Sequence, residues 1–255
     1  MEKSPNPNRF QDQKHLEYSN KVALFEGEVN LVNYNKSIVK KFSSYFKLPS
    51  EAKYNLNFTE TIVDFGAGVG NLSQLFLVEF GVKPICIEVD PELQKVLAQK
   101  SFRVASKISE IDGEISMVFS SNVLEHISDD LGILKELYFS MAPKAKLAIY
   151  VPALNFIFSE LDTKAGHFRR YGRRELIKKV AASGFVVEKC FYGDSLGVIA
   201  SLILKIVGYR NKFGVGAGKS LIFYDRFVYP MSQILDSWGM RYVAGKNLFL
   251  FAVKN

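Results

Sequence analysis

The chain has 255 residues, of which 48% are hydrophobic and 23% are charged. This length and balance allow one α/β domain with additions, or less readily two small domains, and they are typical of a globular protein rather than a disordered one. The 33 Lys and Arg exceed the 26 Asp and Glu to give a net charge of +7, but the basic residues are scattered, so no nucleic-acid partner is expected.

The first fifty residues are predicted to form an N-terminal lead-in. The opening "MEKSPNPNRFQDQKH" is polar and contains no apolar core of the kind that a secretory signal needs. Apolar residues then recur every three to four positions from Leu31 to Phe46, and Pro49 follows. This period predicts a helix at the end of residues 1–50.

Residues 51–255 alternate between strand-like and helix-like segments. We expect strands at 61–65, 83–90, 102–106, 115–121, 145–152, 185–192 and 246–255, and helices at 71–80, 91–99, 122–141 and 173–183. Strands that alternate with helices predict a single α/β domain with a doubly wound, mostly parallel, seven-stranded sheet. In such a sheet ligands bind beyond the carboxyl ends of the strands.

The stretch "TIVDFGAGVGNLS" at residues 61–73 places glycines 66, 68 and 70 between the first strand and its helix. Glycines let the backbone approach a ligand closely, and the helix N-terminus behind them favours negative charge. Asn71 stands where the dinucleotide motif needs glycine, and the acid Asp64 would repel a pyrophosphate. A ligand with both an ammonium and a carboxylate fits better, although a tight turn without a ligand is the plain alternative.

The second predicted strand ends in Glu88, 24 residues after Asp64. A carboxylate at this place can accept hydrogen bonds from both hydroxyls of an unphosphorylated ribose. An amino acid joined to a nucleoside is S-adenosylmethionine, which is therefore the predicted cofactor.

The segment "MVFSSNVLEHISDDLGILKELYFSMAPKAKLAIYVP" resembles the fourth strand, helix and fifth strand of class I S-adenosylmethionine-dependent methyltransferases. The resemblance runs from about Ile62 to Phe191. It implies a Rossmann-like sheet whose last strand is antiparallel. The later "GHFRRY" resembles a subset of these enzymes associated with uncharacterised small-molecule or lipid-linked sugar pathways.

The resemblance also implies the cofactor-binding residues. Glu88 would hold the ribose, Val89 would pack on the adenine and Ile108 would lie near it. The methionine part and the sulfonium would lie against a larger set: Asp64, Gly66, Ala67, Gly68, Gly70, Ser121 and Asn122. The chain departs from many relatives by having Ser106 and Lys107 after the third strand and Ser116 before the fourth, so adenine recognition by backbone and apolar contacts is expected.

Two groups of residues are candidates for the acceptor side. His126 follows the fourth strand and is either a general base or a packing residue, whereas Glu125 beside it is expected to be solvated or ion-paired. His167, Arg170 and Tyr171 belong to "GHFRRY", where a histidine and arginines could hold a phosphate or carboxylate. The alternative is that the Arg and Tyr side chains only tie this loop to the sheet.

No metal is expected, because the three histidines and the two cysteines, Cys86 and Cys190, are far apart in the sequence and show no CxxC pair. The same cysteine usage favours a reducing, cytoplasmic location.

Residues 194–240 interrupt the alternation with glycines and aromatic residues. This insertion is predicted to form a lid over the acceptor pocket. It could instead only cover the sheet, or its 196–207 helix could rest on a membrane or contact another subunit. No window is long and apolar enough for a membrane span.

Together these features predict an S-adenosylmethionine-dependent methyltransferase that acts on an O or N atom of a small or lipid-like acceptor, such as one with an anionic head and an apolar body. The alternatives are a protein that binds S-adenosylmethionine without catalysis, and a nicotinamide-dependent oxidoreductase. Asn71 disfavours the oxidoreductase.

Overall fold

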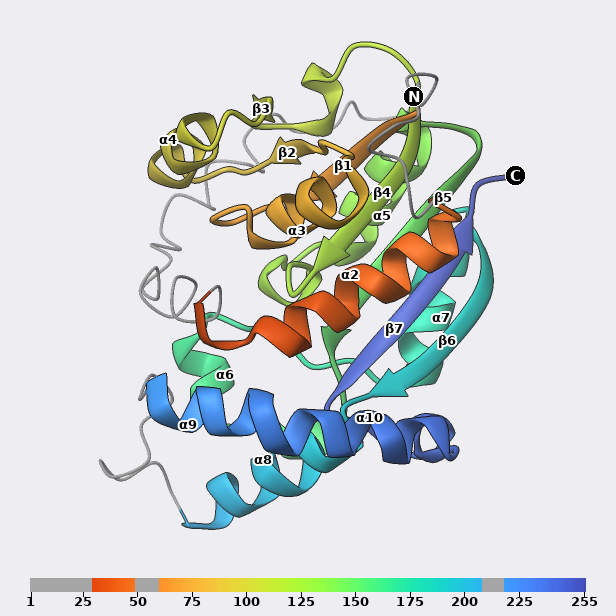
Figure 1. The fold of residues 1–255 in the computed structure, drawn as a ribbon. Coiled ribbons are helices and arrows are strands. Elements are labelled where there is room, and N and C mark those ends of the chain that lie inside the picture. The colour runs from red at the N-terminus through yellow and green to blue at the C-terminus, as the bar shows by residue number, and fades with distance from the viewer. Residues whose placement is uncertain (1–28, 49–59, 208–217) are drawn as a thin grey trace.

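The central element is a seven-stranded sheet with the order β3-β2-β1-β4-β5-β7-β6 (Figure 1). The computed structural model describes residues 29–48, 60–207 and 218–255. The polar opening and part of the insertion lie outside this range. The strands are β1 (Thr61–Phe65), β2 (Ile85–Ile87), β3 (Val104–Ala105), β4 (Ile115–Ser121), β5 (Met141–Pro152), β6 (Val186–Gly193) and β7 (Asn247–Val253).

Strand directions confirm the predicted fold class. β1 pairs in parallel with both β2 and β4, and β4 pairs in parallel with β5. β7 alone runs the other way, antiparallel to β5 and β6. Because the chain leaves β1 toward β2 and later returns to β4, the order reverses between β1 and β4, which is where doubly wound sheets bind ligands.

Helices cover both faces of the sheet (Figure 1). The described helices are α2 (Val32–Phe46), α3 (Asn71–Phe80), α4 (Pro91–Gln99), α5 (Asp130–Ser140), α6 (Glu160–Lys164), α7 (Arg173–Ala182), α8 (Ser195–Val207), α9 (Gly218–Phe223) and α10 (Tyr229–Ser237). On one face, Phe42 of α2 and Phe76 of α3 pack against Phe119 of β4, with ring centroids 5.8 and 4.6 Å apart. On the other face, Leu134 of α5 and Leu176 of α7 join the second core cluster. The described part of the predicted lead-in, α2, therefore belongs to one layer of the fold.

The helix predicted over 122–141 is wrong at its start. Asn122 has a left-handed φ of 54°, the next residues form a 3₁₀ turn (Leu124–His126), and α5 begins only at Asp130. The Asp129 side chain accepts a hydrogen bond from Gly132 N at 3.0 Å and so caps α5. The LEHI segment is therefore a turn at the carboxyl end of β4 and not the first part of a helix.

The insertion gathers α8, α9 and α10 beyond the ends of β6 and β5 (Figure 1). A π-helical segment (Tyr224–Val228) joins α9 to α10. The buried carboxylate of Asp225 accepts hydrogen bonds from the backbone of Asn33 and Tyr34, at 2.9 and 2.8 Å, and so ties the insertion to the start of α2. Within the described residues, no helix has the length and apolar character to cross a membrane.

Candidate active site

The glycine turn lies between β1 and α3 and has left-handed φ values of 78°, 57° and 81° at Gly66, Gly68 and Gly70. A Cβ on Gly66 would lie 2.3 Å from Val123 Cγ2, so only glycine lets this turn pack against the segment that follows β4. The turn is also held to β2, because the backbone N–H groups of Gly66 and Ala67 donate to Ile87 O at 2.9 and 3.0 Å. The predicted turn is therefore a close-packed cradle at the switch point of the sheet.

Asp64 lies just below this cradle and is buried. Burial raises the pKa of its carboxyl to about 7, and the nearby Glu88 raises it as well, against a hydrogen bond from Ser73 Oγ at 2.7 Å that lowers it. A carboxyl with such a pKa is ready to ionise when a cationic group arrives.

Glu88, at the end of β2, holds the turn through its side chain. Its Oε2 accepts a hydrogen bond from Gly68 N at 2.8 Å, and its Oε1 accepts from Val89 N and Asp90 N at 2.8 and 2.9 Å. A carboxylate offers about four acceptor positions, so about one remains, on the oxygen nearer the glycine turn. Glu88 can therefore bind a ribose hydroxyl while it keeps the cradle in shape.

The other cofactor candidates differ in exposure. Val89 is 72% exposed, which is unusual for an apolar side chain beside a buried carboxylate, and suits a residue that packs on a ligand, whereas Ile108 is buried in the core. Ser121 ends β4, and Asn122 N donates to Tyr150 O at 2.8 Å. The residues present fit a cofactor with an ammonium, a ribose and a flat apolar base.

The fold joins the two acceptor-side motifs. Phe168 N donates to Glu125 O at 2.8 Å, and Arg169 donates to Ser128 O at 2.9 Å. These bonds connect the GHFRRY loop, which follows β5, to the LEHI turn, which follows β4. Residues 41 or more positions apart therefore form one site at the carboxyl edge of neighbouring strands.

Glu125, His126 and His167 meet there, and we call them the His–Glu cluster. The rings of His126 and His167 lie edge to face with centroids 4.6 Å apart. Glu125 Oε1 lies 4.0 Å from His167 Nε2. Burial raises the pKa of Glu125 to about 8, and burial together with His167 lowers the pKa of His126 to about 4.

The expectation that Glu125 is solvated or ion-paired is wrong. Its side chain is fully buried, and neither of its carboxylate oxygens has a hydrogen-bond partner among the described residues. The reason is the tight 3₁₀ turn, which directs the Glu125 side chain inward and not along the outer face of a helix.

A buried ion pair supports the cluster from behind. Asp162 Oδ1 accepts hydrogen bonds from His167 Nδ1 at 3.0 Å and from Arg170 Nε at 2.8 Å. Burial alone would raise the pKa of Asp162, but the contacts with His167 and Arg170 outweigh it and hold the pKa at about 2. Because an ionised Asp162 can only accept, Nδ1 carries the proton and the lone pair of a neutral His167 is on Nε2, toward Glu125.

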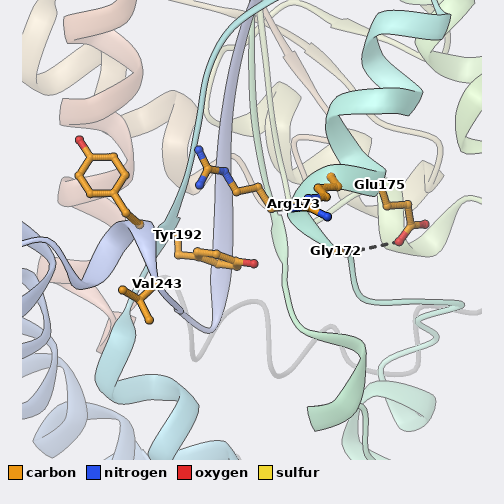
Figure 2. A pocket seen from close by; sticks show the side chains of 7 residues that line it. Gly172, Arg173, Glu175, Tyr192 and Val243 are labelled. Carbon is orange, nitrogen blue, oxygen red and sulfur yellow. Dashed lines mark hydrogen bonds between the residues drawn. The ribbon is translucent and has the colours of Figure 1, made fainter.

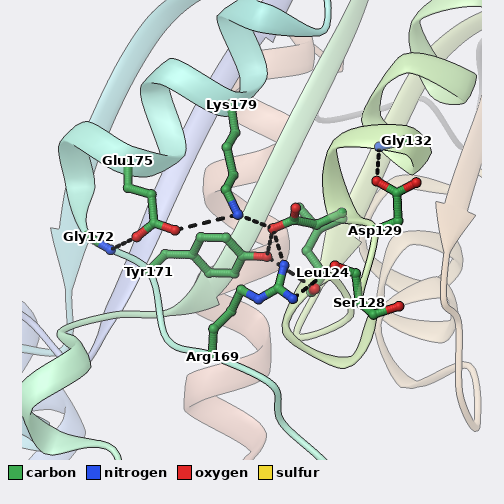
Figure 3. Close-up of polar contacts among 10 residues, drawn as sticks. Leu124, Ser128, Asp129, Gly132, Arg169, Tyr171, Gly172, Glu175 and Lys179 are labelled. Carbon is green, nitrogen blue, oxygen red and sulfur yellow. Dashed lines mark hydrogen bonds and ion pairs between the residues drawn. The ribbon is translucent and has the colours of Figure 1, made fainter.

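Tyr171 is fully buried and its hydroxyl is engaged (Figure 3). It donates to Asp130 Oδ2 at 2.8 Å, which also receives Lys179 Nζ at 2.6 Å and Arg169 Nη1 at 2.7 Å. Burial and Asp130 raise the pKa of Tyr171. Arg170 is also buried, at 8% exposed, and its side chain forms an ion pair with Asp162. The structure thus places both side chains behind the loop surface, where they hold its shape.

Sequence reasoning missed two members of this site, Glu125 and Asp162. A buried carboxylate next to a histidine gives no sequence signal of its own. Asp162 lies in the capping box of α6, where Ser159 N donates to it at 2.9 Å, and its spacing of five residues from His167 would have been the one available hint.

A separate shallow pocket of about 500 Å³ is lined by Gly172, Arg173, Arg174, Glu175, Tyr192, Tyr242 and Val243 (Figure 2). Tyr192 belongs to β6, at the far end of the sheet from the glycine turn beside β1. This pocket is therefore distinct from the cofactor cradle.

Comparisons with known proteins show the family and the fold. Residues 31–189 match the family model described as "Methyltransferase domain". No curated protein matches the sequence. Among solved structures, a phosphoethanolamine N-methyltransferase 2 from Haemonchus contortus, in complex with phosphomonomethylethanolamine and S-adenosylhomocysteine, has a TM-score of 0.58 at 19% identity, and the match covers 98% of this chain and 61% of that one.

Two further structures share the fold. A SAM-dependent methyltransferase from Archaeoglobus fulgidus has a TM-score of 0.56 at 14% identity, and the match covers 91% of this chain and 98% of that one. A geranyl diphosphate methyltransferase in complex with SAM has a TM-score of 0.55 at 11% identity, with 86% of this chain and 84% of that chain covered. Because the family model covers more than half of the residues, the chain belongs to the methyltransferase domain family and is an S-adenosylmethionine-dependent methyltransferase of class I.

Proposed function

We propose that the enzyme methylates an O or N atom of a lipid-like acceptor with an anionic head and an apolar body, as a member of the subset marked by LEHI and GHFRRY. The observation that carries the proposal is the His–Glu cluster at the carboxyl edge of β4 and β5, next to the cradle between β1 and β4. His126 and His167 are assigned to the acceptor, and Arg170 and Tyr171 to positioning the loop that bears His167.

Methyl transfer is an in-line displacement that needs orientation first, and a base only when the nucleophile arrives protonated. S-adenosylmethionine, when bound, supplies a methyl group on a good leaving group. The residues of the cradle, including Asp64, Gly68 and Glu88, hold the cofactor. The neutral Nε2 of His167, oriented by Asp162, is the atom assigned to take up a proton from the acceptor.

Two of the similar structures support the proposed acceptor chemistry by analogy. One is a geranyl diphosphate methyltransferase, and the other is a structure in complex with phosphomonomethylethanolamine. Geranyl diphosphate combines a charged head with an apolar body. At 19% and 11% identity these likenesses establish the fold, and their acceptors serve here only as examples of what the fold can hold.

An apolar stripe on the insertion supports a lipid-like acceptor. Along α9, the π-helical segment and α10, large apolar side chains recur every three to four residues and remain 52–80% exposed: Phe223, Phe227, Met231, Ile234 and Trp238. On α8, Ile199 and Ile203 are 54% and 55% exposed. Such a stripe is typical of a helix that lies on a membrane surface.

The acidic and the basic residues around this apolar stripe lie in different environments. The acids Asp225 and Asp236 bind backbone N–H groups inside the molecule, whereas Lys219 and Arg226 are exposed. The charges left facing outward along 218–243 are therefore basic, which favours an anionic lipid surface. We accordingly extend the proposed membrane contact from the 196–207 helix to α9 and α10. The free, buried cysteines Cys86 and Cys190 are compatible with a cytoplasmic location, which we also propose.

We expect the protein to sediment with vesicles that contain anionic lipid, and much less with neutral vesicles, because basic residues and an apolar stripe act together. The paired variants Phe227→Ser and Trp238→Ser should reduce binding, and raised salt should weaken it. Val78→Ser, which changes an exposed apolar residue on α3, is the matched control. A concentration-dependent dimer that Trp238→Ser dissolves, with no vesicle binding, would show that the stripe instead contacts a second copy.

The methyltransferase function is tested by incubating the enzyme with methyl-labelled S-adenosylmethionine and a lipid extract, followed by mass detection of labelled products. Label in a product with a polar anionic head would support the proposal. Cofactor binding with no labelled product from lipid or aqueous extracts would favour the alternative of a binding protein without catalysis.

A further inference from the structure

The His–Glu cluster has the composition of a metal site. One nitrogen from each histidine and one oxygen from Glu125 lie within 4.8 Å of one another. Two imidazoles and one carboxylate are ligands that divalent zinc accepts. The expectation that no metal takes part rested on the separation of the histidines in the sequence. The fold removes that basis, because it brings His126 and His167 together although they are 41 residues apart.

The buried carboxylate of Glu125 is the second, independent observation. Its residue is 0% exposed, and both of its oxygens lack hydrogen-bond partners within the described part of the chain. Buried polar groups in folded proteins are almost always paired with a protein group, water or an ion. Since the unpaired oxygens belong to a residue whose Oε1 lies 4.0 Å from His167 Nε2, a cation between them would satisfy the carboxylate.

The surroundings of the histidines match those of metal ligands. Metal-binding histidines commonly donate their other ring N–H to a carboxylate or a backbone carbonyl, which fixes the tautomer and the ring. His167 does so through Nδ1 to Asp162, 3.0 Å away, and Asp162 is itself held by Arg170. His126 has a hydrogen bond with the backbone of Gly166.

We propose that Glu125, His126 and His167 bind one divalent ion of the zinc class. Ligand atoms at about 2.1 Å from a tetrahedral ion lie about 3.4 Å apart, so the 4.0 Å gap from His167 Nε2 to Glu125 Oε1 needs only a small side-chain movement. Three protein ligands leave one position open, as in catalytic zinc sites. Resting on the proposed function, we assign that position to the acceptor oxygen or nitrogen. Its proton would pass to solvent more readily because the bound ion would stabilise the deprotonated acceptor, and His167 Nε2 would then act as a ligand and not as the proton acceptor.

The test uses Co²⁺, a coloured substitute for zinc, added to the full chain after treatment with a chelator. We expect one Co²⁺ to bind per chain and to give the intense visible absorption bands of a low-coordinate ion. One equivalent of Zn²⁺ should then displace the Co²⁺ and remove these bands. Zinc binding should also raise the melting temperature of the protein. His126→Ala and His167→Ala should abolish the bands, Glu125→Gln should weaken them, and Glu79→Gln, an exposed carboxylate on α3, should not change them. Calorimetric binding of S-adenosylhomocysteine by each variant shows that it is folded.

Absence of bands beyond those of aqueous Co²⁺, or bands that persist in the double variant of His126 and His167, would overturn the inference. The wild-type zinc displacement and melting shift need no variant, so the inference stays testable if a substitution prevents folding. Metal binding without any methylated product would support the metal site and contradict the proposed acceptor function. Methyl transfer that resists the chelator, in a protein that binds no Co²⁺, would support the proposed function and contradict the metal site.

Discussion

Replacing His167 by alanine is expected to lower turnover about 100-fold to 10,000-fold, the range for loss of a group that handles a proton in the transition state, with cofactor affinity nearly unchanged. Cofactor affinity should be unchanged because His167 lies in the His–Glu cluster and not in the cradle assigned to the cofactor. The measurement is the rate of product formation with the acceptor found in the labelling experiment, together with calorimetry of S-adenosylhomocysteine.

Two further variants separate chemistry from architecture. Asp162→Asn keeps the shape of the support but no longer fixes the His167 tautomer, so it should reduce turnover by a smaller factor. Arg170→Ala should also cripple turnover, with a lowered melting temperature because it leaves the buried Asp162 without its ion-pair partner. Arg174→Ala, beside the separate pocket, should behave as wild type. Normal turnover by His167→Ala would show that the cluster is loop architecture only.

Replacing Glu88 by alanine is expected to weaken S-adenosylmethionine binding by about 1.5 to 3 kcal/mol, the usual cost of losing a hydrogen bond to a charged group. This corresponds to about a 10-fold to 150-fold rise in Kd. Since the same carboxylate holds Gly68, Glu88→Ala should also lower the melting temperature. Asp64→Ala should weaken S-adenosylmethionine binding by a similar amount to Glu88→Ala. Calorimetry that shows NAD binding and no S-adenosylmethionine signal would contradict the assignment of the cradle.

The pH dependence of cofactor affinity should identify Asp64. Its pKa in the free protein is about 7, so below pH 7 the carboxyl is protonated and must lose its proton to pair with the ammonium. Affinity should therefore rise from pH 6 to pH 7.5, until an α-amino group itself begins to lose its proton at about 7.7 to 8.0. Asp64→Asn should give a weaker and flatter profile over this range, while a wild-type profile in that variant would exclude Asp64 from the ammonium contact.

The stability of the free protein should change in the opposite direction. An aspartate in the unfolded chain has a pKa of about 3.9, lower than the value of about 7 in the folded state. The folded state therefore holds this proton more tightly, and the contribution of Asp64 to stability falls as the pH rises from about 4 through 7. The melting temperature of Asp64→Asn should lack this contribution.

The fold could be predicted because its signals are local. The glycines at 66, 68 and 70 and the helix start at Pro91 are written in neighbouring residues, and the structure gives α4 from Pro91 to Gln99 as expected. The antiparallel direction of the last strand was implied by the resemblance, and its place between β5 and β6 was not predicted, since no local pattern encodes which strands become neighbours.

The candidate acceptor site could be predicted only in part, because its geometry depends on contacts between distant segments. His126 and His167 were visible as candidates, but the left-handed Asn122 that turns the LEHI segment inward has no strong sequence signature. The burial of Glu125 and the support from Asp162 follow from that turn and from the Phe168-to-Glu125 backbone bond, which no periodicity reveals.

The antiparallel pairing of β6 with β7 makes the whole insertion a long hairpin loop. Gly193 lies opposite Asn247, so the two ends of the insertion leave the sheet about one strand spacing, roughly 4.8 Å, apart. The entropy of closing a loop grows only slowly with its length, and the insertion leaves the sheet from β6 and β7, whereas the glycine turn follows β1. Evolution can therefore exchange this loop for one of another size or polarity while β1 and β4 remain as they are.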